Sequence, residues 1–215
     1  MTSKTRKLSG LAALALTMSV SLAACGSDDT ASNAGNDSGM KSSETTGGTD
    51  QAMNQPFGPA CDQVPATGDG SFQGMATAPV ASAASANPLL STLVTAVGAA
   101  DLVEPLNSAP ELTVLAPANP AFDAIPKKDL NALLKNKPAL TTVLTHHVIP
   151  GKLSPDQLAG DHDTLAKDTV SISGSGEDFT IDAGNGNTAK ILCGNIQTAN
   201  ATVYVIDSVL MPAKM

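Results

Sequence analysis

The spacing of hydrophobic positions changes along the chain and separates helical from extended parts. Between residues 79 and 106 the apolar side chains recur at helical spacing, and Asn87-Pro88 supplies a cap and a first-turn proline. The residues that carry this pattern are Leu89, Leu90, Leu93, Val94 and Val97. We predict a helix that ends near Gly98, and we expect Pro105 to break the short segment that follows.

The middle of the chain combines one strand with short helices. Residues 112–117 alternate and include β-branched side chains, which predicts a strand. The segments expected next are a short helix from Asn119-Pro120 that closes at Pro126, helices over 129–134 and 138–145, and extended chain over 146–150.

Beyond residue 161 the pattern becomes one of short alternating segments separated by turns. Glycine-rich turns are indicated at 174–176, 184–187 and 194–195. The strands expected around them are 168–173, 178–183, 189–193, 196–198 and 202–211. Helices first and hairpins later indicate a single α+β domain with mainly antiparallel strands.

The N-terminal residues are typical of a bacterial lipoprotein signal. A positive start at Lys4, Arg6 and Lys7 precedes an uncharged run over 8–24, which is short for a membrane span. The run ends in Leu22-Ala23-Ala24-Cys25, which resembles a lipobox. We predict a signal peptide over 1–24 and lipidation of Cys25, so that the protein is anchored in the cell membrane and faces outward. The alternatives are ordinary secretion with a cysteine there by chance, and shedding of the anchored protein.

A polar segment separates this signal from the domain. Residues 25–56 are rich in Ser, Thr, Gly, Asn and Asp and show no apolar periodicity, which is typical of a disordered tether. Such a linker has an r.m.s. span of roughly 30 Å. Thr45, Thr46 and Thr49 are candidate O-glycosylation sites, and an unmodified linker is the alternative. The domain itself is expected over 57–215, with a cysteine-bearing extension at its start.

Charge and cysteine content limit the classes of function that the chain can have. The formal net charge is −8 and there is no Trp, which argues against nucleic-acid binding because that needs clustered cations and stacking surfaces. Once Cys25 is assigned to lipid, Cys61 and Cys193 remain as an even pair in an exported protein, which predicts a disulfide. A metal site is the alternative, but neither CxxC spacing nor nearby histidines support it.

Three segments together resemble the fasciclin domain family. They are TVLAPANPAF over 113–122, LTHHVIPG over 144–151 and ATVYVIDSVLMP over 201–212, and the resemblance covers about residues 75–213. It implies a β-sandwich-like wedge packed with a cluster of helices. The chain is similar in particular to mycobacterial fasciclin-domain lipoprotein antigens, which share the lipobox, the tether and the cysteine pair. The family often has Tyr where this chain has His146.

The motif residues are expected to be structural. His147 occupies the family's histidine position, where the resemblance implies packing and hydrogen bonding beside the first motif. Thr113, Asn119 and Phe122 belong to that motif. Asp207 belongs to the last, and alternation places it on a face with Val203, Val205 and Val209, opposite Tyr204, Ile206 and Leu210. A buried aspartate there needs a partner such as a backbone N–H or a hydroxyl.

No catalytic constellation emerges from the polar residues. Adjacent His146 and His147 would point to opposite faces of an extended segment, and a joint metal site with His162 is disfavoured. No G-x-S-x-G occurs, and the acidic residues near 161–168 lack a calcium-loop pattern. We therefore predict no enzyme activity, no cofactor and no bound metal.

One basic patch stands out from an acidic chain. Lys127, Lys128, Lys135 and Lys137 surround one predicted helix. The simpler interpretation is a solvated helix face, and the sharper one is a contact for an anionic envelope glycolipid or an acidic partner.

Two classes of function remain. The first is a non-enzymatic, monomeric cell-surface lipoprotein that presents one fasciclin domain for adhesion, or for interaction with a surface protein, matrix or envelope glycolipid. The alternative is a binder of a small apolar or lipid ligand in a cleft between helices and sheet. Co-purifying lipid would favour the alternative.

Overall fold

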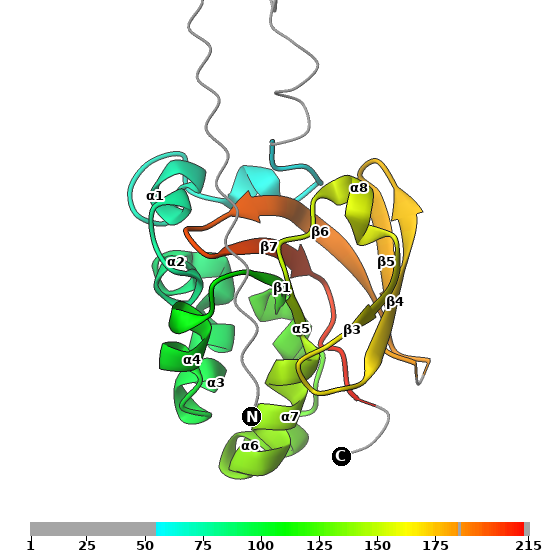
Figure 1. Ribbon diagram of the computed structural model, residues 1–215. Helices are drawn as coiled ribbons and strands as arrows, with labels where there is room; N and C mark the ends of the chain where they lie inside the picture. Colours follow the sequence, from blue (N-terminus) through cyan, green and yellow to red (C-terminus); the bar gives the residue numbers. More distant parts are fainter. Residues whose placement is uncertain (1–54, 185, 213–215) are drawn as a thin grey trace, which may run out of the picture. The chain divides into compact units, whose positions relative to one another are not determined.

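The computed structural model describes residues 55–184 and 186–212 (Figure 1). Its helices, including two 3-10 turns η2 and η3, are η2 (Cys61–Gln63), α1 (Phe72–Ala76), α2 (Val80–Ala86), η3 (Pro88–Leu90), α3 (Ser91–Ala99), α4 (Val103–Ser108), α5 (Asn119–Asp123), α6 (Lys127–Lys135), α7 (Lys137–His146) and α8 (Pro155–Leu158). Its strands are β1 (Leu112–Pro117), β2 (Val148–Pro150), β3 (Gly160–Asp163), β4 (Thr169–Ser175), β5 (Asp178–Asp182), β6 (Thr188–Gln197) and β7 (Ala201–Ile206). The predicted α+β class with mainly antiparallel strands is confirmed.

The strands form a seven-stranded sheet in the order β2-β1-β7-β6-β5-β4-β3. Among the described strands only β1 and β7 pair in parallel, from Leu112 beside Ala201 to Pro117 beside Ile206, and the other pairs are antiparallel. The N–H of Leu165, just after β3, donates to the carbonyl of Val148 in β2 at 2.8 Å. The two ends of the strand order therefore meet, and the sheet curls toward a barrel-like wedge.

Two hydrophobic clusters lie on the two faces of the central strands. Val203 and Val205 of β7 pack in the cluster shared with helices α2, α3 and α7. Tyr204 and Ile206 pack in a second cluster within the curl of β4, β5 and β6. The predicted alternation along this strand is confirmed. Because both faces are covered, every residue of β1 and β7 is buried.

Helix α3 ends at Ala99, next to the end predicted near Gly98. Other predicted boundaries are wrong for identifiable reasons. Pro105 does not break its segment, because it lies in the first turn of α4, where no helical partner for its missing N–H is needed. The strand expected over 202–211 ends at Ile206, where the N–H of Asp207 donates to the Lys190 carbonyl at 3.0 Å.

The turn predicted at Gly194-Asn195 is also wrong, because β6 runs through it with shifts of register on β7. Asn195 adopts a positive φ of 58° there, as expected of a bulge. The bulge is covered by the N-terminal extension, since Phe57 and Gly194 form a β-bridge. Strand β3 was not anticipated, because its Gly-Asp-His-Asp sequence has no apolar alternation.

Among the described residues no single helix has the length and apolar character needed to cross a membrane, and only the bent pair 80–86 and 88–99 passes by length and composition.

Candidate functional site

His147 ties the end of α7 to the chain that follows β7. Its Nδ1 donates to the Val143 carbonyl at 2.7 Å, and its Nε2 accepts from the N–H of Leu210 at 2.9 Å. These partners fix the tautomer, because a carbonyl can only accept and an amide N–H only donate. Desolvation by burial lowers the pKa of His147 from 6.5 to about 4. The ring is therefore neutral near pH 7, and neither nitrogen is available to a ligand.

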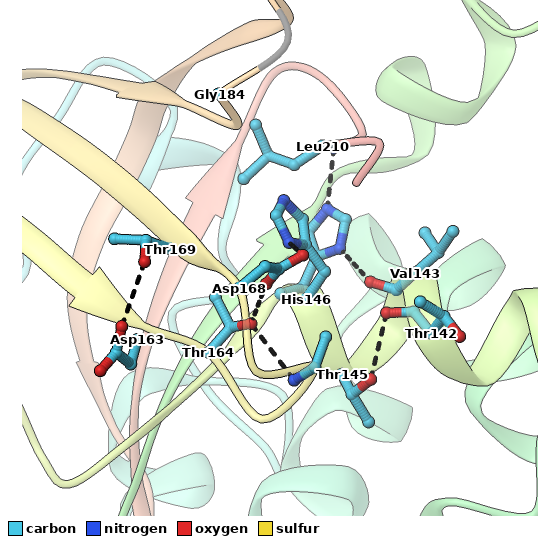
Figure 2. A network of polar contacts seen from close by, with 12 residues as sticks. Thr142, Val143, Thr145, His146, Asp163, Thr164, Asp168, Thr169, Gly184 and Leu210 are labelled. Carbon is cyan, nitrogen blue, oxygen red and sulfur yellow. Dashed lines mark hydrogen bonds and ion pairs between the residues drawn. The ribbon is translucent and has the colours of Figure 1, made fainter. Parts of the chain in front are cut away.

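His146 is directed to a different partner. Its Nδ1 lies 2.6 Å from a carboxylate oxygen of Asp168, in the loop between β3 and β4 (Figure 2). Burial by itself raises the pKa of Asp168, but the hydrogen bonds from Thr164 and His146 outweigh it and leave that pKa below its usual value. The carboxylate is thus ionised and accepts both bonds. The Nε2 of His146 is buried and has no hydrogen-bond partner among the described residues.

The prediction that the two histidines point to opposite faces of an extended segment is wrong. His146 ends α7 and His147 caps it, so the rings lie 6.1 Å apart in an edge-on arrangement. They still do not converge on one ligand, since His147 bonds backbone and His146 bonds Asp168. His162 lies apart with its Nε2 at 2.9 Å from the Leu158 carbonyl. The described part of the chain contains no group of three or more side chains able to hold a metal ion.

The other motif residues join neighbouring segments. The Thr113 hydroxyl donates to the Gly151 carbonyl at 2.7 Å and accepts from the N–H of Leu153 at 2.9 Å. Asp207, only partly buried, accepts from the N–H of Lys190 at 2.8 Å, a backbone partner of the kind expected for it.

Asn119 and Phe122 hold α5 in place. The Asn119 side chain accepts from the N–H of Thr92 at 3.0 Å and donates to the Pro88 carbonyl at 2.8 Å, while Phe122 is buried in the helical cluster. These contacts connect α5 to the start of α3. They leave neither side chain directed at a ligand.

The predicted disulfide is present between Cys61 and Cys193, across a sequence separation of 132 residues. It fixes the N-terminal extension on β6. Beside it the ring of Phe57 packs against Phe179 and Tyr204, with centroid distances of 5.9 and 6.4 Å. The start of the domain is therefore attached to the sheet at a defined place.

A small apolar cleft lies between the helices and the sheet. Its volume is about 50 Å³. Its lining comes from α2, α3, α4, β1, α7 and β2 and includes Val80, Ala84, Val94, Val103, Val114 and His147. Val103 is 40% exposed, which is unusual for a large apolar residue here. Because both nitrogens of His147 are bonded elsewhere, that residue offers no free polar group to an occupant.

The lysines predicted as a patch do not form one uniform group. Lys127, Lys128 and Lys135 are exposed on α6. Lys137 begins α7 and is paired with Asp101, which lies between α3 and α4. The basic surface is therefore smaller than the sequence suggested.

The model of the fasciclin domain matches residues 88–212, more than half of the chain. The chain belongs to the fasciclin domain family. It is 43% identical over 176 residues to the cell surface glycolipoprotein MPB83 of Mycobacterium bovis, covering 76% of this chain and 77% of that one. It is 44% identical over 163 residues to the immunogenic protein MPB70 of the same species, covering 72% and 81%.

A solved fasciclin domain pair from the insect cell adhesion molecule fasciclin I is also similar, at 24% identity and a TM-score of 0.46, covering 57% of this chain and 45% of that one. The MPB83 relative is named a cell surface glycolipoprotein, and the MPB70 relative an immunogenic protein.

Sequence reasoning missed one residue that organises this fasciclin domain. Asn200, just before β7, accepts from the N–H of Val80 at 2.9 Å and donates to the carbonyls of Leu106 and Ala109, both at 2.8 Å. It thereby connects α2, α4 and the sheet. Its position immediately before the last motif is the only signal that marked it. Asp168 was missed as the partner of His146, since no sequence pattern links the two.

The residues predicted for lipidation and glycosylation, Cys25, Thr45, Thr46 and Thr49, lie outside the described residues.

Proposed function

We propose that the chain is a non-enzymatic, lipid-anchored cell-surface protein that presents its fasciclin domain for adhesion or for interaction with a surface partner. In this proposal residues 1–24 are a signal peptide, 25–56 are the lipidated tether, and 57–215 are the presented domain. The name of the MPB83 relative, a cell surface glycolipoprotein, supports the location.

The geometric observation that carries the proposal is the place where the tether joins the domain. The disulfide and the Phe57 contacts hold the extension at one end, beside β6, and α6 lies at the opposite end (Figure 1). A domain held by this end presents α6 and the neighbouring loops away from the anchor. The predicted tether, about 30 residues long, would leave it free to turn.

The absence of an enzyme site is part of the same proposal. The histidines of the described part are bonded to backbone groups or to Asp168. Such an arrangement is suited to recognition of a partner by the surface of the domain, without a catalysed reaction.

The test expresses the full chain in a bacterium that processes lipoproteins, alongside a Cys25→Ser variant. We expect palmitate labelling and surface exposure for the parent chain, and release into the medium for the variant. Cells that display the parent chain should adhere to matrix proteins, host cells or sister cells more than cells that express the variant. Unlabelled parent chain contradicts the anchor, and equal adhesion of the two strains contradicts the adhesive role.

The apolar cleft favours a second candidate, the binding of a small apolar group. An engineered apolar cavity of about 150 Å³ binds benzene, so a cleft of about 50 Å³ takes only the end of an acyl chain or a single side chain unless α4 moves. Helix α4 has no buried residue and carries the exposed Val103. Lipid that co-purifies with the parent chain and is lost in Ala84→Leu, which fills the cleft, would support this candidate.

A further inference from the structure

Three lysines form a basic face on α6. Lys127, Lys128 and Lys135 follow helical spacing that places them within about 100° of one another around the helix, and all three are exposed. None of them is within ion-pairing distance of an acidic group in the described residues. We call these three residues the lysine face. Lys137 is excluded because it is paired with Asp101.

Stability of the helix does not account for these lysines. Leu130, Leu133 and Leu134 of α6 pack against the helical cluster, whereas the three lysines are exposed and cover no core. Lys127 and Lys128 lie in the first turn, where the helix dipole disfavours positive charge. The charges of Lys127 and Lys128 therefore destabilise the helix.

Charge is strongly segregated in the domain. Residues 127–137 contain four lysines and one aspartate, a formal charge of +3. The remaining described residues contain three lysines and fourteen acidic residues, a formal charge of −11. A molecule with this asymmetry is oriented by an anionic surface, because its basic end is attracted and the rest is repelled.

The lysine face also lies at the end of the domain opposite the N-terminal extension (Figure 1). On a chain held at that extension by a tether that lets the domain turn, the face can be directed away from the anchoring membrane. It can therefore meet a second surface without the acidic remainder of the domain standing between them.

We propose that the lysine face docks the domain on an anionic lipid surface that faces the anchoring membrane. This inference rests on the proposed display of the domain and names what one of its faces contacts. The lysines project from the outside of a single helix and are point charges without the planar fork of arginine. Such a face suits a flat surface of diffuse negative charge. An acidic protein would be held better by a shaped groove with bidentate donors.

The test uses the chain from residue 25 with Cys25→Ser, so that no acyl group contributes to binding. All buried residues of both clusters lie beyond residue 63, and the chain retains them. Sedimentation with phosphatidylglycerol–phosphatidylcholine vesicles is measured at about 50 mM salt, where surface charges are weakly screened. Each lysine near an anionic surface strengthens binding about fivefold. The double variant Lys127→Gln/Lys135→Gln should therefore bind the vesicles about 25-fold more weakly.

Lys190→Glu is the matched control. It changes the net charge by the same −2 as the double variant, and Lys190 is exposed on β6, away from α6. We expect it to lose less than about threefold in binding. Circular dichroism of each variant confirms that it is folded.

Three results would overturn the inference. They are no binding of the parent chain to the anionic vesicles, equal losses in the control and the double variant, and equal binding to pure phosphatidylcholine. Retention on immobilised polyglutamate without vesicle binding would assign the face to an acidic protein instead. None of these results needs the anchor or a cell, so the inference can fail while surface display stands.

Discussion

The imidazole Nδ1 of His146 lies 2.6 Å from a carboxylate oxygen of Asp168, and this contact connects the end of α7 to the loop between β3 and β4 (Figure 2). The histidine side chain is fully buried, whereas that of Asp168 is 34% exposed. The same carboxylate accepts from the Thr164 hydroxyl, whose oxygen accepts from the N–H of Ala166 at 3.2 Å. One aspartate therefore organises its own loop and holds it against the helix.

Asp168→Ala should lower the free energy of unfolding by about 2 kcal/mol near pH 7, because it leaves the buried Nδ1–H of His146 without an acceptor. Urea unfolding measures the loss. Since the pKa of Asp168 is lowered in the folded state, its contribution is present above the ordinary value of 3.8 and disappears as the pH falls through the folded value. Asp163→Ala is the control, because the Asp163 side chain is exposed and, within the described residues, accepts one bond, from the Thr169 hydroxyl. Similar losses for the two variants would contradict the assigned role.

His147 should lower the free energy of unfolding in mild acid, because its ring binds a proton in the unfolded chain before it does in the folded one. The folded state keeps the ring neutral down to a pKa of about 4, whereas the unfolded chain binds a proton below 6.5. The free energy of unfolding should therefore decrease by up to about 3 kcal/mol between pH 6.5 and pH 4. His147→Asn keeps a donor and removes the titration, so its profile should be lower near pH 7 and flatter below it. A profile parallel to that of the parent chain would exclude His147 as the source.

Reduction of the disulfide should destabilise the domain substantially. The loop between Cys61 and Cys193 spans 132 residues, for which the chain-entropy model gives about 5 kcal/mol as an upper value. Thermal unfolding of Cys61→Ser/Cys193→Ser, compared with the oxidised parent chain, measures the effect. An unchanged midpoint would mean that the Phe57 contacts alone hold the extension.

Gly194 should tolerate no side chain. A Cβ atom there would lie 2.5 Å from the ring of Phe57 and 2.9 Å from that of Tyr204. Gly194→Ala is expected to cost about 1–3 kcal/mol through overpacking. The second change Phe57→Leu should recover part of that loss, and a double-mutant cycle measures the coupling. Strictly additive losses would contradict the contact.

Asn200→Asp should destabilise the domain strongly, although the two side chains have similar shapes. The substitution keeps an acceptor for the N–H of Val80 but replaces the donor to the Leu106 and Ala109 carbonyls with an oxygen. We expect a loss of about 3 kcal/mol, because a buried charge then faces two acceptors. Asn131→Asp, on the exposed side of α6, should change stability by less than about 0.5 kcal/mol. Hydrogen exchange of α2 and α4 would locate the effect.

Much of the fold was predictable because its signals are local. Burial on alternate sides of β7 follows from a period of two residues, and the helices α6 and α7 follow from apolar spacing and prolines. The motifs over 113–122, 144–151 and 201–212 give the family, since each combines residue types at fixed short distances. With Cys25 predicted to carry lipid, Cys61 and Cys193 left only one intramolecular pairing.

Other features depend on contacts between distant segments, to which no local pattern corresponds. Residues 146–147 end a helix and do not begin a strand. For this reason His146 contacts the Asp168 carboxylate, while His147 accepts a hydrogen bond from the N–H of Leu210. Strand β6 passes through Gly194 because Phe57, far away in the sequence, covers the bulge. The sequence by itself determined the family, the α+β class with helices before hairpins, and the faces of the strands, through short-range periodicity and local motifs. Only the tertiary structure decided the partners of buried polar groups and the separation of the lysine face from the disulfide-bonded N-terminal extension, because both depend on where the packed helices and the sheet meet in space.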